Sequence, residues 1–377
     1  MTSAKRHKIL ILDNSLDMGG VEKKLFDLIP RFDPDRFEVV VCCLKEGGYF
    51  RRPLEEKGIR VYERLLRHKY DLLAYRRFRN IIDRERVDLV YSFLHPNAVI
   101  FSAMAKMSGA VRAWIVSVHA TGSHTGIRLV KPYLKPFLSR VDRFIAVANE
   151  HREYLVTVEG LPRDRTEVIH NGVDSELYRP GPAAGALRTG LGIPEGARVI
   201  ATTASLKPIK RIDLLLAAAA RVVREVPDAF FLIIGDGPDR RQLEEQAGAL
   251  GLREKVLFAG LRDDVYDLLR LGSLFVLSSK TEAFPNVVLE AMATGLPVVS
   301  TDVGSVREMV EEGKSARIVP PEDSDALAGA MVELLSRPDL MQSFGERARS
   351  IVVERFTLEM MRVRREALFA SLLGNVK

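Results

Sequence analysis

A repeated alternation of short apolar runs with amphipathic stretches constrains this fold more than any other feature of the sequence. In the first half, the apolar runs predict strands at residues 8–12, 37–44, 58–62, 88–92, 114–118, 143–147 and 167–169. In the second half, they predict strands at residues 199–204, 230–234, 256–258, 274–277, 297–300 and 316–319. Helical stretches separate the strands in both halves. This alternation is typical of α/β domains with doubly wound, mostly parallel sheets.

The length of the chain indicates two domains. Its 377 residues exceed what a single hydrophobic core usually supports. The segment 178–194 is rich in Gly, Pro and Ala, which is typical of a boundary between domains. We therefore expect a first domain at residues 1–179, a linker at 180–194 and a second domain at 195–356. A final amphipathic helix at 357–377 is expected to pack back on the first domain.

Composition and cysteine usage indicate the compartment. Apolar residues make up 47% and charged residues 28% of the chain, which describes a soluble globular protein. Cys42 and Cys43 are adjacent on a predicted strand, so their side chains point to opposite faces and cannot form an ordinary disulfide. No apolar run approaches the roughly 18 residues that span a bilayer. We expect a cytoplasmic protein, with peripheral attachment to the inner face of the cell membrane as an open alternative.

The net charge of +6 belongs to the N-terminal half, where residues 64–86 are the most basic stretch. Apolar side chains interleave there with Arg64, Arg67, Lys69, Arg76, Arg77 and Arg79. The first interpretation is a solvated helix face. A second is adhesion to anionic lipid headgroups. Nucleic acid is the least favoured partner, because no recognition motif accompanies the charge.

The most informative single stretch is 278–295, in which a loop leads from a predicted strand into a very apolar helix. The loop carries Glu282, and Glu290 interrupts the helix. A charge in so apolar a helix is costly unless something pairs with it. Pro285 is expected at the first helical position, where its missing N–H costs nothing, and the free amides that follow suit an anion. The stretch therefore predicts a site for a phosphorylated, hydroxyl-rich ligand.

Other polar groups follow predicted strands, at the sheet edge where such folds bind ligands. Gly19 and Gly20 follow the first strand, and His119 follows the strand at 114–118. Lys207 and Lys210 follow the strand at 199–204, where two ammonium groups would neutralise a diphosphate. Taken singly, each has a structural alternative: turn glycines, a buried structural histidine, solvated lysines.

These motifs together resemble the retaining glycosyltransferases of family 4. The resemblance rests on GGVE, VHA, NGVD, SLKPIKRIDLLL, IIGDGP and EAFPNVVLEAMATGLPVVSTDVGS, and it covers nearly the whole chain. It implies the GT-B fold, with two Rossmann-like domains facing a central cleft. It also implies a nucleotide-sugar donor held mainly by the second domain, an acceptor held mainly by the first, and no metal or cofactor.

The resemblance also implies roles for individual residues. His119, Lys210 and Glu282 would be catalytic: His119 contacts the donor sugar, Lys210 stabilises the leaving diphosphate, and Glu282 lies near the reacting carbon. Glu290 would bind the ribose hydroxyls. The remaining donor-binding residues would be Gly19, Gly20, Ser205, Lys207, Gly235, Leu261, Arg262, Ala283, Phe284, Pro285, Asn286 and Val287.

The donor is expected to be a UDP-sugar, with a GDP-sugar as runner-up, and the acceptor a glycan or glycolipid of the cell envelope. Two departures from the family pattern stand out. Ala204 and Ser205 replace a Gly-Arg pair, and Ala283 replaces a glycine, so a positive φ there would strain the chain. A GT-B nucleotide-sugar epimerase and a non-catalytic, basic nucleic-acid-binding protein remain alternative functions.

Overall fold

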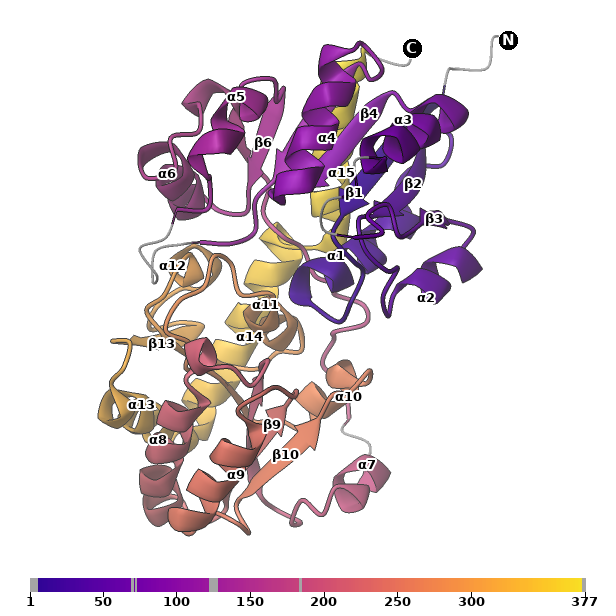
Figure 1. The fold of residues 1–377 in the computed structure, drawn as a ribbon. Coiled ribbons are helices and arrows are strands. Elements are labelled where there is room, and N and C mark those ends of the chain that lie inside the picture. The colour runs from indigo at the N-terminus through magenta and orange to yellow at the C-terminus, as the bar shows by residue number, and fades with distance from the viewer. Residues whose placement is uncertain (1–5, 69–70, 72, 122–127, 183–184, 375–377) are drawn as a thin grey trace. The chain divides into compact units, whose positions relative to one another are not determined.

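The computed structural model describes residues 6–68, 71, 73–121, 128–182 and 185–374 of the chain. It divides the chain into two compact units. Unit 1 comprises Met1–Asn171 and Leu358–Lys377, and unit 2 comprises Gly172–Thr357. Each unit contains one parallel sheet with helices packed on it (Figure 1).

The sheet of unit 1 has seven parallel strands in the order β3-β2-β1-β4-β5-β6-β7. They are β1 (His7–Asp13), β2 (Phe37–Cys43), β3 (Arg60–Tyr62), β4 (Leu89–Phe93), β5 (Ala113–Ser117), β6 (Arg143–Ala146) and β7 (Thr166–Val168). The strand order reverses between β1 and β4, which is the place where a doubly wound sheet opens a crevice for a ligand. All described pairings are parallel, as the alternating pattern predicts.

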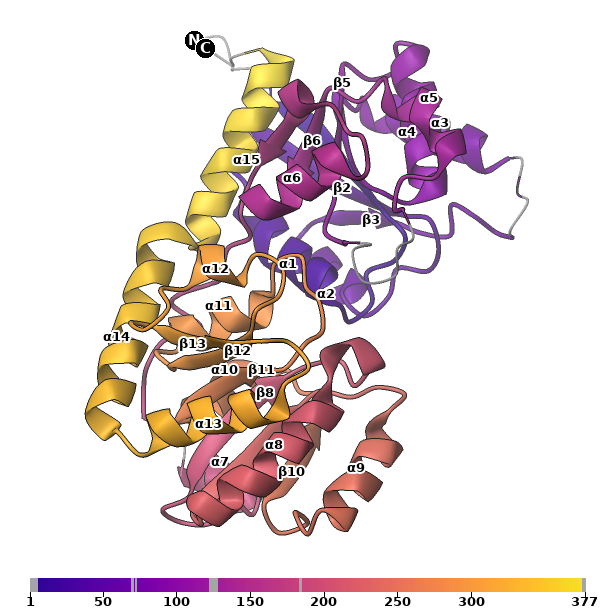
Figure 2. The ribbon, with the colours of Figure 1, turned by 90° about the vertical axis from the view of Figure 1, so that its left-hand side faces the viewer.

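Two hydrophobic clusters cover the two faces of this sheet, and Cys42 lies in one while Cys43 lies in the other. One face carries α1 (Gly20–Leu28), α2 (Arg51–Glu56) and α15 (Leu358–Leu373). The other carries α3 (Ala74–Glu85), α4 (Pro96–Met107), α5 (Lys135–Leu138) and α6 (Asn149–Thr157). Helix α15, drawn in yellow, runs along the sheet of unit 1 in both views (Figures 1 and 2).

The sheet of unit 2 has six parallel strands in the order β10-β9-β8-β11-β12-β13. They are β8 (Arg198–Thr203), β9 (Ala229–Ile234), β10 (Val256–Gly260), β11 (Leu274–Leu277), β12 (Val298–Thr301) and β13 (Ala316–Val319). The helices are α7 (Gly185–Gly190), α8 (Ile212–Glu225), α9 (Arg240–Ala249), α10 (Val265–Arg270), α11 (Asn286–Ala293), α12 (Val306–Met309), α13 (Ser324–Leu335) and α14 (Pro338–Arg355). Apolar residues of α8, α9 and α13 build the main core.

Three expectations about elements need correction. The units divide after Asn171, before the predicted linker at 180–194, and that range contains the short helix α7. Residues 338–355, for which no element was predicted, form α14, whose mixed polar sequence hides a buried stripe through Phe344, Ala348 and Ile351. Pro285 is the extended residue that caps α11, with φ −73° and ψ 100°, and is not its first helical residue.

The basic stretch at 64–86 contributes to the core of unit 1. Leu65, Phe78 and Ile82 are buried there, so these apolar side chains are unavailable to lipid. Three of the six predicted lipid-binding cations form ion pairs, in the pairs Arg64–Glu46, Arg77–Asp71 and Arg79–Asp83. Arg67 and Arg76 are exposed, and Lys69 lies outside the described residues. No helix in the described part of the chain is long and apolar enough to cross a bilayer.

Candidate active site

In unit 2, a lysine and a carboxylate meet at the carboxyl ends of two neighbouring strands. The Lys210 Nζ donates to Glu282 Oε1 at 2.6 Å, and the Ser279 hydroxyl donates to the same oxygen at 2.7 Å. Both charged side chains are partly exposed, Lys210 by 24% and Glu282 by 13%. The structure therefore brings together two residues that the sequence placed 72 positions apart. Each balances the other's charge while remaining within reach of a ligand.

The loop after β11 is tied to its neighbours by hydrogen bonds. The Ser278 hydroxyl donates to the carbonyl of Lys210 at 2.9 Å, and the N–H of Lys280 donates to the carbonyl of Ile209 at 2.8 Å. From β12, the Thr301 hydroxyl donates to the carbonyl of Ser279 at 2.7 Å. These bonds fix the backbone on both sides of the Lys210–Glu282 pair, so the pair has a defined geometry before any ligand binds.

The backbone around Ala283 shows where a glycine is required. Outside glycine, the described residues have positive φ at Arg64, Arg86, Arg211 and Glu322, so Ala283 is not strained. The position that requires glycine is instead Gly304, which has φ +50°. A Cβ at Gly304 would lie 1.8 Å from the carbonyl oxygen of Glu282. Gly304 therefore allows the loop after β12 to touch the loop that carries Glu282.

Helix α11 places Glu290 in a buried position beside this loop. The residue is 7% exposed, and its neighbours on the helix, from Val288 to Ala293, are buried. The helix packs against β11, β12 and α14, and Arg349 of α14 donates to the carbonyl of Ala293. The backbone N–H groups of the first helical turn have no carbonyl within the helix to which they can donate a hydrogen bond. A buried carboxylate and a helix start of the kind predicted to hold an anion thus belong to one element.

Most of the other residues predicted to bind the donor lie just after β8, β9 and β10, and Phe284 lies in the loop after β11. Lys207 and Ser205 are exposed, and Lys207 forms no ion pair with any described residue. Gly235 has φ +124°, and a Cβ there would lie 2.0 Å from the Ala204 carbonyl oxygen. Leu261 is 62% exposed, whereas Arg262 is held by both carboxylate oxygens of Asp264. Phe284 is buried against Phe356, so only its backbone can face a ligand.

Arg211, the residue after Lys210, adopts a left-handed conformation with φ +50° and ψ 42°. Its guanidinium pairs with Asp213 and with Glu322, which also has a positive φ and pairs with Lys280 at 3.0 Å. Such conformations cost energy in non-glycine residues and persist where surrounding contacts hold them. This network fixes the turn between Lys210 and α8.

In unit 1, His119 lies just beyond β5 and is held as a neutral imidazole. Its Nε2 is 2.8 Å from the Ser117 hydroxyl, and its ring packs against Phe93 with centroids 5.5 Å apart. Burial is the main cause that lowers the pKa of His119 to about 3, with smaller contributions from the positive charge of Arg365 and from the neighbouring His151. At neutral pH, the ring is therefore uncharged and acts as a hydrogen-bond donor or acceptor.

His151 fixes the backbone after His119. Its Nδ1 accepts from the N–H of Val147 at 3.3 Å, which leaves Nε2 to donate to the carbonyl of Ala120 at 2.9 Å. Burial lowers the pKa of His151, so it too is neutral. The sequence analysis did not identify this role, because His151 belongs to α6 and meets Ala120 only in the folded sheet.

The glycine pair lies where α1 begins, with Gly19 as the extended N-cap residue and Gly20 as the first helical residue. The carboxylate of Glu22 folds back toward Gly19, because its Oε2 lies 2.1 Å from where a Cβ on Gly19 would stand. Burial raises the pKa of Glu22, while a hydrogen bond from its own backbone N–H lowers it. The carboxylate of Glu22 therefore occupies the space beside Gly19, and it must move before a diphosphate can bind there.

Five residues that sequence reasoning missed support the predicted site residues within each unit. Ser279, Thr301 and Gly304 shape the loop that carries Glu282, and Ser117 and His151 orient His119 and the backbone after it. All five lie at or just beyond strand ends or at a helix start, which is the one signal that would have singled them out.

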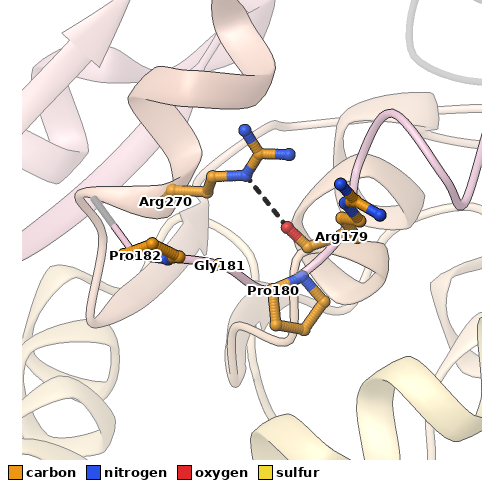
Figure 3. A pocket seen from close by; sticks show the side chains of 5 residues that line it. All are labelled: Arg179, Pro180, Gly181, Pro182 and Arg270. Atoms are coloured by element: carbon orange, nitrogen blue, oxygen red, sulfur yellow. Dashed lines mark hydrogen bonds between the residues drawn. The ribbon is translucent and has the colours of Figure 1, made fainter. Parts of the chain in front are cut away.

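A hollow of about 370 Å³ lies elsewhere in unit 2 (Figure 3). It is lined by Arg179, Pro180, Gly181, Pro182 and Arg270, none of which is among the predicted site residues. The Arg270 guanidinium donates to the carbonyls of Arg179 and Leu177, both at 3.0 Å. Because these bonds use the guanidinium to hold the chain near the start of unit 2, we assign the hollow a structural role.

Both units match models of known protein families. A family model described as glycosyl transferases group 1 matches residues 185–351, and one described as Glycosyltransferase Family 4 matches residues 18–177. The chain belongs to glycosyltransferase family 4. The first match contains Lys210, Glu282 and Glu290, and the second contains Gly19, Gly20 and His119.

Two curated relatives and one solved structure illustrate the family-4 relationship. The chain is 27% identical to the N-acetyl-alpha-D-glucosaminyl L-malate synthase of Bacillus anthracis, over 82% of this chain and 81% of that protein. It is 25% identical to the UDP-Gal:alpha-D-GlcNAc-diphosphoundecaprenol alpha-1,3-galactosyltransferase of Escherichia coli, over 84% and 85%. The fold matches that of HepE from Anabaena, solved with UDP and glucose, with a TM-score of 0.83, 24% identity and coverage of 97% and 100%. The GT-B fold expected from the resemblance is confirmed.

Proposed function

We propose that this protein is a metal-independent, retaining glycosyltransferase that uses a UDP-sugar. It transfers a hexosyl or N-acetylhexosaminyl group to a hydroxyl of a glycan or lipid-linked acceptor during cell-envelope glycan synthesis. The observation that carries the proposal is the Lys210–Glu282 pair, held by Ser279 in the loop that leads into α11. A cation at the departing diphosphate and a carboxylate near the sugar both favour nucleotide-sugar transfer, and the loops after β8 and β11 supply them as Lys210 and Glu282.

The chemistry we propose follows from these positions. The bond between the anomeric carbon and the diphosphate oxygen breaks, and its electron pair stays on the diphosphate. Lys210 and the first-turn amides of α11 stabilise that growing negative charge more than they stabilise the bound donor, which lowers the barrier. The acceptor oxygen attacks from the face that the diphosphate leaves, and its proton passes to a phosphate oxygen, so the anomeric configuration is retained.

Glu282 and Glu290 hold the donor in this scheme. Glu290, buried in α11, accepts hydrogen bonds from the two ribose hydroxyls, which offsets the cost of burying its charge. Once the donor phosphate pairs with Lys210, Glu282 loses its bond to Lys210 and contacts the transferred sugar instead. The exposed Leu261 offers an apolar surface for the base. The resemblance assigns His119 to the donor sugar, and its neutral ring suits a hydrogen bond to a sugar hydroxyl.

The names of the curated relatives support the donor and the acceptor. The Escherichia coli relative is named for UDP-galactose and a diphosphoundecaprenol-linked sugar, and the Bacillus anthracis relative for N-acetylglucosaminyl transfer. We propose that the exposed cations Arg67 and Arg76 attract an anionic membrane surface that carries such an acceptor. Flotation with vesicles of phosphatidylglycerol and phosphatidylcholine tests this part, because an Arg67→Gln/Arg76→Gln variant should float less.

A donor panel tests the proposal as a whole. The protein is incubated with UDP-glucose, UDP-galactose, UDP-N-acetylglucosamine or GDP-mannose, with a short-chain lipid diphosphate monosaccharide as acceptor and with or without EDTA. We expect UDP release with at least one UDP-sugar, insensitivity to EDTA, and an α-linked product by proton NMR. A nucleotide at a hundred times its dissociation constant should also stabilise the fold by about 2.7 kcal/mol. Stabilisation by a DNA oligomer but by no nucleotide would contradict the enzyme assignment.

A further inference from the structure

Arg211, the residue that follows Lys210, adopts a backbone conformation that is rare for an arginine. Its φ of +50° and ψ of 42° lie in the left-handed region, where the Cβ of an L-residue crowds the following carbonyl. Four non-glycine residues of the described chain have a positive φ, and a second one of them, Glu322, forms an ion pair with Arg211. Two residues in costly conformations that hold each other call for an explanation beyond packing.

Two carboxylates of unit 2 hold the Arg211 side chain. Its Nε donates to both oxygens of Asp213, at 3.0 and 3.2 Å, and its Nη2 donates to Oδ2 of Asp213 at 3.1 Å. Its Nη1 donates to Oε1 of Glu322 at 2.5 Å. Asp213 lies in the first turn of α8, whereas Glu322 lies between β13 and α13, 111 positions beyond Arg211. The guanidinium therefore bonds its own turn to a distant segment of the same unit.

The exposure of these side chains indicates what the ion pairs do. The side chain of Arg211 is 23% exposed, and those of Asp213 and Glu322 are 47% and 46% exposed. Ion pairs between exposed charges usually contribute little to stability, because water already solvates both partners. Glycine at position 211 would adopt the same backbone conformation without a steric penalty. The side chain of Arg211 thus serves mainly to hold the turn in a conformation that an arginine does not favour.

The turn held by Arg211 lies directly beside the Lys210–Glu282 pair. It separates the 3₁₀ turn Pro208–Lys210 from α8. The carbonyl of Lys210 accepts from the Ser278 hydroxyl, and its Nζ donates to Glu282. If φ at Arg211 relaxed to an ordinary value, the peptide that joins it to Lys210 would rotate, and Lys210 would move relative to Glu282.

We propose that Arg211 and Glu322 are positioning residues that set the direction of the Lys210 side chain. Both would act through Lys210, so neither is a catalytic residue. The inference rests on the proposed function, since Lys210 is the group that would stabilise the departing diphosphate. Glu322 also pairs with Lys280, but Lys280 is not among the described residues with positive φ, and its removal would leave the bond between Arg211 and Glu322 in place.

Nuclear magnetic resonance of protein that contains 13C-labelled lysine tests the inference without a substrate. Lys210→Met identifies the signal of the Lys210 side chain. Arg211→Ala removes both ion pairs and leaves a Cβ at positive φ, so the turn should relax and the Lys210 signal should shift. Arg211→Gly removes the same ion pairs but tolerates the conformation, so the signal should stay close to its wild-type position. An unchanged signal in Arg211→Ala, or an equal shift in Arg211→Gly, would overturn the inference.

Arg198 offers a matched control at the opposite end of β8. It donates to both carboxylate oxygens of Asp228, its side chain is 35% exposed, and it is absent from the described residues with positive φ. Arg198→Ala should leave the Lys210 signal unchanged, and a shift as large as that of Arg211→Ala would contradict a specific role for Arg211. If Arg211→Ala does not fold, Glu322→Ala tests the same bond, and an unchanged Lys210 signal there would overturn the inference.

Kinetics with the donor identified by the panel connect the position of Lys210 to the reaction. Arg211→Ala should lower kcat about 10-fold with little change in the donor KM, within the roughly 100-fold loss that a misplacement of about 1 Å can cause. Arg211→Gly should recover most of this loss. A shifted Lys210 signal with unchanged kcat would overturn the catalytic part of the inference. Absence of any transfer in wild type would contradict the proposed function, and the Lys210 signal would still decide whether Arg211 positions that side chain.

Discussion

The charged and titratable groups at the candidate sites of the two units differ in their pairing. In unit 2, Lys210 and Glu282 are both partly exposed and bonded to each other, so each has a partner that a ligand can replace. In unit 1, His119 is neutral, and the nearby charge of Arg365 is buried with no carboxylate of the described residues within ion-pair distance. A partly exposed ion pair can exchange partners with a charged substrate at low cost, whereas a half-buried neutral imidazole provides one fixed hydrogen bond. The difference suggests that unit 2 handles charge during the reaction and unit 1 supplies fixed orientation.

Removing one member of the Lys210–Glu282 pair is the most direct test of this difference between the units. Lys210→Ala should lower kcat about 100- to 1,000-fold, the loss that follows removal of one group that stabilises transition-state charge. Glu282→Gln should also lower turnover strongly. Lys280→Ala is the matched control, because Lys280 lies in the same loop but pairs with Glu322. Steady-state UDP release measures all three, and equal losses in Lys210→Ala and Lys280→Ala would refute the role of Lys210.

Glu290 tests whether the buried carboxylate of unit 2 serves the donor or the fold. Glu290→Gln keeps the shape but removes the charge, so donor affinity should fall about 10- to 100-fold, since hydrogen bonds to charged groups contribute about 1.5–3 kcal/mol. Isothermal titration with UDP measures the affinity. Stability should change little, because glutamine keeps the shape of the side chain and can still form hydrogen bonds. A large drop in melting temperature with unchanged UDP affinity would show that Glu290 is structural.

Gly304 tests whether the geometry of the Glu282 loop depends on contact with the loop after β12. Gly304→Ala places a Cβ 1.8 Å from the Glu282 carbonyl, whereas Gly313→Ala, also at positive φ, meets nothing closer than 3.5 Å. Both substitutions should lower the unfolding free energy by about 1 kcal/mol because of the left-handed conformation. Gly304→Ala should lower it by about 1–3 kcal/mol more because of the clash. Chemical denaturation compares them. Equal unfolding free energies would mean that the contact is dispensable.

The neutral His119 of unit 1 predicts a smaller, pH-dependent effect. Because its folded pKa of about 3 is below the roughly 6.5 of an unfolded histidine, only the unfolded chain takes up this proton between those values. Wild type therefore loses this contribution to stability as pH falls from 7.5 to 5, and His119→Gln does not.

The melting temperatures of the two proteins measure this effect. Their difference should narrow by about 4–8 °C over that range, because 1.5 pH units below 6.5 correspond to about 2 kcal/mol and each kcal/mol shifts the melting temperature of a domain of 150–250 residues by about 2–4 °C. His151 is present in both proteins, so its own titration cancels. A constant difference would show that His119 is not held neutral.

Much of the fold was readable from the sequence because strands in parallel sheets are short apolar runs between helices. The predicted bounds of β11 and β13 agree with the structure at both ends. Helix α14 was missed because its surface is highly charged and its buried stripe is interrupted by polar residues.

The sequence by itself determined that Glu282, Lys210 and His119 follow apolar runs typical of buried strands and that Glu290 interrupts an apolar helix, and the predicted chemical roles rest on these positions. Only the tertiary structure decided what those residues touch. The bond between Lys210 and Glu282, the contact of Gly304 with the Glu282 carbonyl, and the hydrogen bond from Arg365 to Tyr91 join separate loops, strands and helices. Arg365 and Tyr91 are 274 positions apart. Local periodicity carries no information about such pairs, since it reports which face of an element is buried and not which element lies against it.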